Sequence, residues 1–144
     1  MATDRTAEVT WHGDLMSGSG RVDSVTSGAI GGLDVDWRAR SEDGQTKTSP
    51  EELIAAAHAS CFLMALSGGL GRADHPAEEL KTSATVTFQP GEGITKIALQ
   101  VTGNVPGMSQ DDFGQAAQTA KENCPVSKAL AGVPEITLDA RLQG

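Results

Sequence analysis

The chain has 144 residues, which is the size of one ordinary domain, and its composition is not that of a disordered, collagen-like or membrane protein. Aromatic residues make up only 3% of the chain and tyrosine is absent, so we expect an aliphatic core and no aromatic platform for bases. The formal net charge of -8 opposes binding to phosphate backbones and to anionic lipid. Nucleic acid and membrane surfaces are therefore not expected as partners.

The N-terminal sequence, the apolar stretches and the two cysteines indicate the cellular compartment of the protein. No basic segment leads into an apolar run at the N-terminus, and no stretch is expected to approach the ~20 apolar residues of a membrane helix. We therefore predict a cytoplasmic protein. Reducing compartments keep ordinary thiols reduced, so a pairing of Cys61 with Cys124 is expected to be transient and catalytic.

The first third of the chain alternates apolar and polar residues, which predicts extended structure. Three strands are expected, over residues 7–11, 21–26 and 33–39. The Gly- and Ser-rich segments between them are interpreted as hairpin turns. A phosphate loop is the alternative, but neither segment has the Walker lysine or the spaced glycines of a dinucleotide fingerprint.

A helix is predicted to begin at Pro50. Ser49 can cap it, proline suits the first helical position, and Glu52 completes a capping box. The helix is expected to run through Leu66 and to end at Gly68. Because it is apolar nearly all round, we expect most of its faces to be buried, by a curved sheet or by a second subunit.

The second half of the chain predicts a hairpin, a helix and a last strand. The hairpin strands are expected at 84–88 and 94–101, and the last strand at 136–142. Between them, Ser109 opens a helix whose apolar stripe leads inward to Cys124, before Pro125 interrupts it. The order of elements predicts a single α+β domain over residues 1–144, with mainly antiparallel sheet.

Position alone leaves the role of Cys61 open. Burial in an apolar helix disfavours the thiolate, so without a nearby cation Cys61 would be an inert core residue. Core packing is therefore an equal alternative to catalysis on this ground. A metal site is not expected, because there is no C-x-x-C motif, and His58 is interpreted as a packed helical histidine.

Two segments of the sequence bear on whether Cys61 is a catalytic residue or a core residue. Residues 49–62 (SPEELIAAAHASCF) and 123–130 (NCPVSKAL) closely resemble the two signatures of the OsmC and organic hydroperoxide resistance (Ohr) family. The resemblance extends to WHGD at 11–14 and to ITKIAL at 94–99, so it covers nearly the whole chain. His58 and Val126 are more similar to the OsmC branch than to the Ohr branch.

The resemblance implies both a fold and an activity. The implied fold has two central helices packed on curved, mainly antiparallel sheets, in an intertwined homodimer with its active sites at the subunit interface. The implied activity is a thiol-dependent peroxidase of the oxidative stress response, which needs no cofactor and acts on organic hydroperoxides. Cys61 would form the sulfenic acid and Cys124 would resolve it as a disulfide, which an external dithiol of the lipoyl type would reduce.

The resemblance also implies an arginine that lowers the pKa of Cys61 and a glutamate that holds this arginine. Glu51 matches the glutamate. Arg38 and Arg40 both qualify as the arginine, since side chains two apart share one face of the expected strand. Spacing to Pro50 favours Arg40, with Arg38 as the alternative, although residues 42–49 form a longer approach than in many relatives.

A non-enzymatic function is the competing hypothesis. In it, the chain is a stress-related dimer that binds a small hydrophobic ligand, and both cysteines only fill the core. A buried thiol with a raised pKa is a poor nucleophile, so such a protein would keep its thiols in the presence of hydroperoxide.

Overall fold

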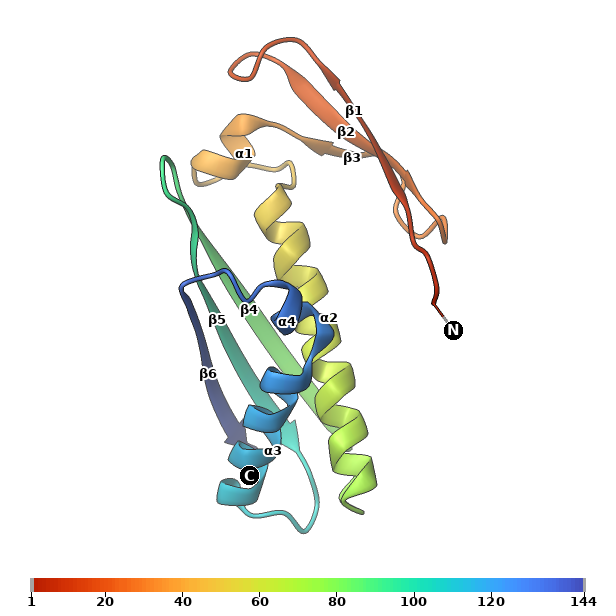
Figure 1. Cartoon of the computed structure of the whole chain (residues 1–144), viewed down its shortest axis with the longest axis vertical. Coiled ribbons are helices and arrows are strands. Elements are labelled where there is room, and N and C mark those ends of the chain that lie inside the picture. Colours follow the sequence, from red (N-terminus) through yellow and green to blue (C-terminus); the bar gives the residue numbers. More distant parts are fainter. Residues whose placement is uncertain (1, 144) are drawn as a thin grey trace. The chain divides into compact units, whose positions relative to one another are not determined.

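The computed structural model describes residues 2–143, which fall into two compact units. The first unit ends at Leu53 and the second begins at Ile54. The boundary lies in the first turn of the long helix α2 (Pro50–Arg72), which Figure 1 shows with the other elements.

The first unit contains a three-stranded antiparallel sheet in the order β1-β2-β3. Its strands are β1 (Ala7–His12), β2 (Ser19–Val25) and β3 (Leu33–Val35). The glycine inside β2 has a packing reason, because a Cβ atom at Gly20 would lie 2.6 Å from Cε3 of Trp11 on the neighbouring strand. The two predicted hairpins are confirmed.

The strand predicted over residues 33–39 is wrong in its second half. Residues from Trp37 onward form the short helix α1 (Trp37–Ser41). Asp36 caps this helix, since its Oδ1 accepts a hydrogen bond of 2.7 Å from the backbone N–H of Ala39. The apolar alternation continues past Val35, but the cap overrides it.

The start of α2 is confirmed and its end is not. The Ser49 hydroxyl accepts a hydrogen bond of 3.2 Å from the backbone N–H of Glu52. The helix continues through Gly68, where it was predicted to end, as far as Arg72. Leu70 is fully buried in the core, and this packing offsets the cost of glycine in the last turns.

The prediction that α2 is buried on most faces included coverage by a second subunit, and within the single chain only one stripe of the helix is buried. The fully buried side chains of α2 form one stripe with a spacing of four residues, namely His58, Phe62, Leu66 and Leu70. Met64, on another face, is 75% exposed. One sheet and one neighbouring helix in the second unit cover only a single stripe of the helix.

The prediction that no segment approaches the size of a membrane helix is also wrong. By length and composition alone, α2 is long and apolar enough to cross a bilayer. The core helix of a soluble protein satisfies the same test, so this finding is weak evidence for a membrane span.

The second unit contains a sheet in the order β4-β5-β6. The strands β4 (Glu79–Gln89) and β5 (Gly93–Asn104) form the predicted hairpin, and β6 (Glu135–Leu142) pairs with β5 in parallel. The helices α3 (Gln110–Asn123) and α4 (Pro125–Ala129) connect β5 to β6. Helix α4 was not predicted.

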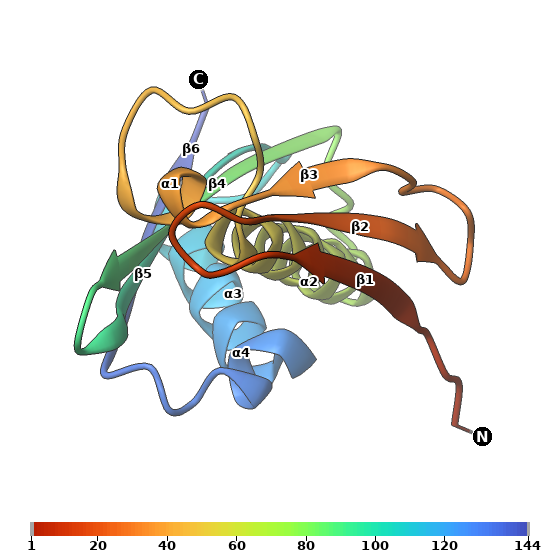
Figure 2. The same cartoon turned by 90° about the horizontal axis from the view of Figure 1, so that it is seen from above.

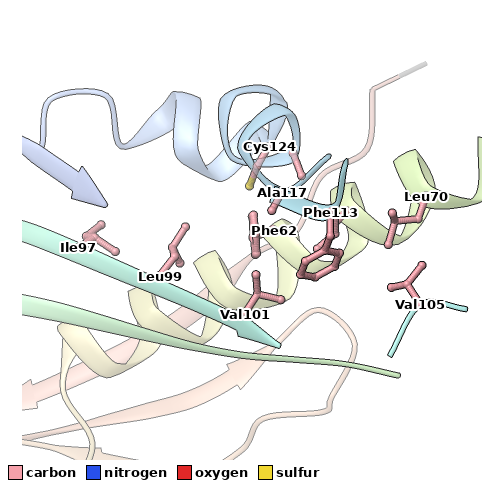
Figure 3. Packing of buried hydrophobic residues seen from close by; sticks show 11 residues of the cluster. Phe62, Leu70, Ile97, Leu99, Val101, Val105, Phe113, Ala117 and Cys124 are labelled. Atoms are coloured by element: carbon pink, nitrogen blue, oxygen red, sulfur yellow. The ribbon is translucent and has the colours of Figure 1, made fainter. Parts of the chain in front are cut away.

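The core of this unit joins α2, α3 and β5. Helices α2 and α3 lie side by side, as Figures 1 and 2 show. Alternate residues of β5 point into the core beneath them. Figure 3 shows the resulting cluster, which includes Phe62, Ile97, Leu99, Val101, Phe113, Ala117 and Cys124. The predicted inward position of Cys124 is confirmed, since its exposed fraction is 0%.

Candidate active site

The two cysteines meet in the second unit. Cys61 is on α2 and is half-buried, whereas Cys124 is fully buried at the junction of α3 and α4. Both are free thiols. They are hydrogen-bonded to each other, with the S–H group of Cys61 donating to the sulfur of Cys124. The fold therefore brings together two thiols that are far apart in the sequence.

The pKa of Cys124 is lowered below its ordinary value. Burial raises this pKa, but polar groups near the sulfur together outweigh burial. These groups are the thiol of Cys61, the backbone N–H and the hydroxyl of Ser127, and the backbone N–H of Val126. Ser127 and Val126 lie beside Cys124 because Cys124 is the N-cap residue of α4 and both are in the first turn of that helix.

The pKa of Cys61 is raised instead. Burial is the main cause, and the hydrogen bond with Cys124 adds to it, while the backbone N–H of Val126 acts in the opposite direction. The negative charge of the reduced pair therefore resides first on Cys124. The two thiols interact strongly enough to titrate as a pair rather than as independent groups.

A histidine extends this group of residues. His58 is fully buried on α2, and its Nε2 lies 2.7 Å from Oγ of Ser127. Burial lowers the pKa of His58, so the ring is neutral at neutral pH. The sequence favours a packed histidine, with a position near Cys61, three residues on, as the alternative for His58, and it gives no role to Ser127. A signal for Ser127 was its position in the first turn of a helix that begins with Pro125.

The predicted arginine and glutamate form an ion pair within the first unit. Nε of Arg40 donates to both carboxylate oxygens of Glu51, at 2.9 and 3.1 Å. The side chain of Glu51 is 8% exposed and that of Arg40 is 34% exposed. Arg38 pairs instead with Glu42 on the surface.

The helical conformation of α1 explains why Arg40 rather than Arg38 contacts Glu51. Residues two apart share a face of a strand, but they point about 200° apart around a helix. Of the two arginines that the sequence left open, the structure therefore selects Arg40 as the partner of Glu51. Among residues 2–143, no three or more His, Cys, Asp or Glu side chains are grouped as metal ligands would be.

Comparison with known proteins identifies the family. The family described as "OsmC-like protein" matches residues 42–139, the stretch that contains both cysteines. The chain belongs to the OsmC family. The resemblance of the two signature segments is thereby confirmed.

Individual relatives agree with this assignment over nearly the whole chain. The chain is 41% identical over 146 residues to "Peroxiredoxin OsmC" of Escherichia coli strain K12, covering 99% of each protein. It is 28% identical over 145 residues to "Organic hydroperoxide resistance protein OhrB" of Bacillus subtilis strain 168, covering 94% of this chain and 97% of the relative.

A solved structure confirms the predicted OsmC-like fold. The crystal structure of OhrB of Bacillus subtilis matches 96% of this chain and 98% of its own, with a TM-score of 0.63 and 26% sequence identity. The α+β architecture with helices on mainly antiparallel sheets is therefore the fold of this family. The predicted homodimer and the predicted roles of the four site residues stay predictions.

Proposed function

We propose that the protein is a cysteine-dependent peroxidase that reduces organic hydroperoxides to alcohols. The hydrogen bond between the thiols of Cys61 and Cys124 carries the proposal, because it puts a resolving thiol beside the sulfur that would be oxidised. The names of the relatives, a peroxiredoxin and an organic hydroperoxide resistance protein, support the same reaction class.

Access to solvent supports Cys61 as the residue that the hydroperoxide oxidises. Cys61 is half-buried, whereas Cys124 has an exposed fraction of 0%, so a bulky hydroperoxide would reach the sulfur of Cys61 first. Only the thiolate is nucleophilic. Transfer of the shared proton from Cys61 to Cys124 along their hydrogen bond would give the thiolate of Cys61 and the thiol of Cys124.

The proposed oxidation has two steps. The thiolate of Cys61 attacks the distal oxygen of ROOH, the O–O bond breaks, and the alkoxide leaves and takes the proton of Cys124 to give the alcohol. The sulfur of Cys61 is then a sulfenic acid. In the second step, the thiolate of Cys124 attacks this sulfur, the S–O bond breaks, and the hydroxide leaves and takes a proton from solvent to give water. The product is the Cys61–Cys124 disulfide.

An external dithiol would close the cycle. One of its thiolates attacks the disulfide to form a mixed disulfide, and its second thiol displaces the remaining protein thiolate. Both protein thiols are then restored and the dithiol is oxidised. A lipoyl-type dithiol is the reductant that the family resemblance implies.

Arg40 and Glu51 complete the proposal. We assign to Arg40 the cation that lowers the pKa of Cys61, and to Glu51 the carboxylate that orients Arg40. The observed ion pair supports the second role, since the Nε–H of Arg40 is shared between both oxygens of a carboxylate that is nearly buried, which restricts the direction of the guanidinium group. The assignment predicts that Arg40→Met raises the pKa of Cys61, measured by thiolate absorbance in the Cys124→Ser background; an unchanged pKa would remove Arg40 from the mechanism.

The proposal includes a homodimer in the cytoplasm. Met64 and other apolar residues of α2 are exposed in the single chain, which supports coverage by a second subunit. Sedimentation at micromolar concentration should give twice the mass of the chain, and a monomer mass would contradict this part of the proposal.

Thiol counting tests the function. Reduced wild type, Cys61→Ser and Cys124→Ser are treated with about one equivalent of cumene hydroperoxide, and free thiols are titrated after unfolding. We expect wild type to lose both thiols, Cys61→Ser to keep its thiol, and Cys124→Ser to form a sulfenic acid that dimedone traps. Unchanged thiols in wild type would refute the peroxidase and leave the ligand-binding hypothesis. Reaction of Cys61→Ser but not of Cys124→Ser would reverse the two roles.

A further inference from the structure

Two pairs of polar side chains face each other across α2 and α4. His58 and Cys61 are three residues apart on α2, so they lie on the same face of that helix. Cys124 caps α4 and Ser127 is in its first turn, again three residues on. Cys61 contacts Cys124, and His58 contacts Ser127. The hydroxyl of Ser127, three residues after Cys124 in the first turn of α4, also lowers the pKa of the Cys124 thiol, so Ser127 connects the two pairs.

The surroundings of His58 indicate the direction of these bonds. Nδ1 of His58 is buried and has no hydrogen-bond partner among the described residues. A buried N–H group without a partner is rarer and more costly than a bare nitrogen lone pair. The proton of the neutral ring therefore belongs on Nε2, where it is donated to Oγ of Ser127 at 2.7 Å. Ser127 is then free to donate its own proton to the sulfur of Cys124.

We propose that His58 and Ser127 are positioning residues that hold Cys124 as the attacking thiolate for the sulfenic acid of Cys61. This inference rests on the proposed function and concerns its second step. His58 orients the hydroxyl of Ser127, and this hydroxyl stabilises the negative charge on Cys124. The step forms the S–S bond and breaks the S–O bond of the sulfenic acid, and the hydroxide that leaves takes a proton from solvent. His58 and Ser127 gain and lose no proton in it.

The expected effect follows from the loss of one hydrogen bond to a thiolate. Removing the hydroxyl of Ser127 should raise the pKa of Cys124 by about one unit, which lowers its thiolate fraction about tenfold at neutral pH. A more basic thiolate is also more nucleophilic, with a Brønsted slope of about 0.4–0.5. The two effects partly cancel, so disulfide formation should slow by about threefold.

The first test needs no peroxidase activity. In the Cys61→Ser background Cys124 is the only thiol, and its pKa can be read from thiolate absorbance, without interference from tyrosinate because the chain has no tyrosine. Ser127→Ala should raise this pKa by about one unit, and His58→Leu should raise it in the same direction. Ser127→Thr keeps the hydroxyl and His58→Gln keeps a donor near Nε2, so both should restore the original value.

The matched control is Ser83→Ala. Ser83 is an exposed residue of β4, and the same substitution there removes a hydroxyl that belongs to neither of the two pairs. It should leave the pKa of Cys124 unchanged. An unchanged pKa in Ser127→Ala, or an equal shift in Ser83→Ala, would overturn the inference. Circular dichroism confirms that each variant is folded, and His58→Leu compared with His58→Gln provides the test if Ser127→Ala unfolds.

The second test follows the reaction itself in a single turnover. The cysteine pair is kept intact, and dimedone trapping measures the lifetime of the sulfenic acid after cumene hydroperoxide is added. Ser127→Ala should lengthen this lifetime by about threefold, while the preceding loss of hydroperoxide changes by less than about twofold. If wild type consumes no hydroperoxide, the proposed function fails. If wild type reacts and the lifetime in Ser127→Ala is unchanged, only the roles of His58 and Ser127 fail.

Discussion

Replacing Arg40 with methionine leaves the buried carboxylate of Glu51 without its cation. Nε of Arg40 lies 2.9 and 3.1 Å from the two oxygens of this carboxylate, which is only 8% exposed. Methionine keeps the apolar stem of the side chain, so the variant mainly removes the ion pair. We therefore expect a loss of unfolding free energy that reflects an uncompensated charge.

The size of this loss depends on exposure. Breaking a fully buried ion pair costs ~3–5 kcal/mol, whereas an exposed pair contributes ~0–1 kcal/mol. Because the side chain of Arg40 is 34% exposed, solvent screens part of the interaction, and we expect an intermediate loss. A value of about 2 kcal/mol corresponds to a fall in melting temperature of about 6 °C for a chain of this size.

Arg38→Met is the matched control. Arg38 pairs with Glu42 at 3.1 Å, but the two side chains are 63% and 53% exposed. We expect a change within about 0.5 kcal/mol. Adding Glu51→Gln to Arg40→Met should recover part of the loss, because the amide carries no buried charge.

Thermal unfolding followed by circular dichroism, with urea unfolding as a second measurement, compares these variants. We expect Arg40→Met to be clearly less stable than Arg38→Met. Equal losses in the two variants would refute the assignment of Arg40 as the partner of Glu51. A further loss in the double variant would refute the argument from an uncompensated carboxylate.

Three further predictions follow from the second unit. Gly103→Ala should destabilise by about 1–3 kcal/mol in urea unfolding, because its Cβ would lie 2.7 Å from Cζ of buried Phe113; unchanged stability would contradict this packing. Ser109→Ala removes the hydroxyl that caps α3 and should cost about 1 kcal/mol in the same assay, whereas a loss below about 0.3 kcal/mol would show that the cap contributes little. Thiolate absorbance of the reduced wild type should rise in two steps, because the pKa of Cys124 lies below the ordinary value of a thiol and the pKa of Cys61 lies above it; a single step for both thiols would contradict the coupled pair.

Capping residues and turn residues predicted those parts of the fold that depend on contacts between residues close together in the sequence. Ser49 and Pro50 marked the start of α2, and the turn at 90–93 joined two strands that pair as expected. The buried position of Cys124 followed from the stripe of small apolar residues on α3. These features depend on neighbours within a few residues, so a single sequence contains them.

Other features depend on contacts that the sequence does not display. The end of α2 is set by the packing of Leu70, which outweighs the glycines before it. The conformation of residues 37–41 is set by the cap at Asp36, a signal that was present but was outweighed by the apolar alternation. The contact of Ser127 with His58 joins two helices that are far apart in the sequence, and no spacing rule predicts it.

The candidate site also combines features that the sequence predicted with features that it did not. The family resemblance predicted roles for Cys61, Cys124, Arg40 and Glu51; the structure pairs Arg40 with Glu51 in the first unit and places Cys61 beside Cys124 in the second. Sequence reasoning did not predict that the lower pKa would belong to Cys124. That difference arises from the side chain of Cys61 and from Ser127 and Val126 at the start of α4, a helix that was not predicted.

Peptide mapping by mass spectrometry after one turnover with cumene hydroperoxide tests the pairing of the two cysteines directly. We expect one disulfide that links the peptide containing Cys61 to the peptide containing Cys124 within the same chain. Recovery of Cys61 as a sulfinic or sulfonic acid beside a reduced Cys124 would contradict it, because the contact between the two thiols would then not resolve the sulfenic acid.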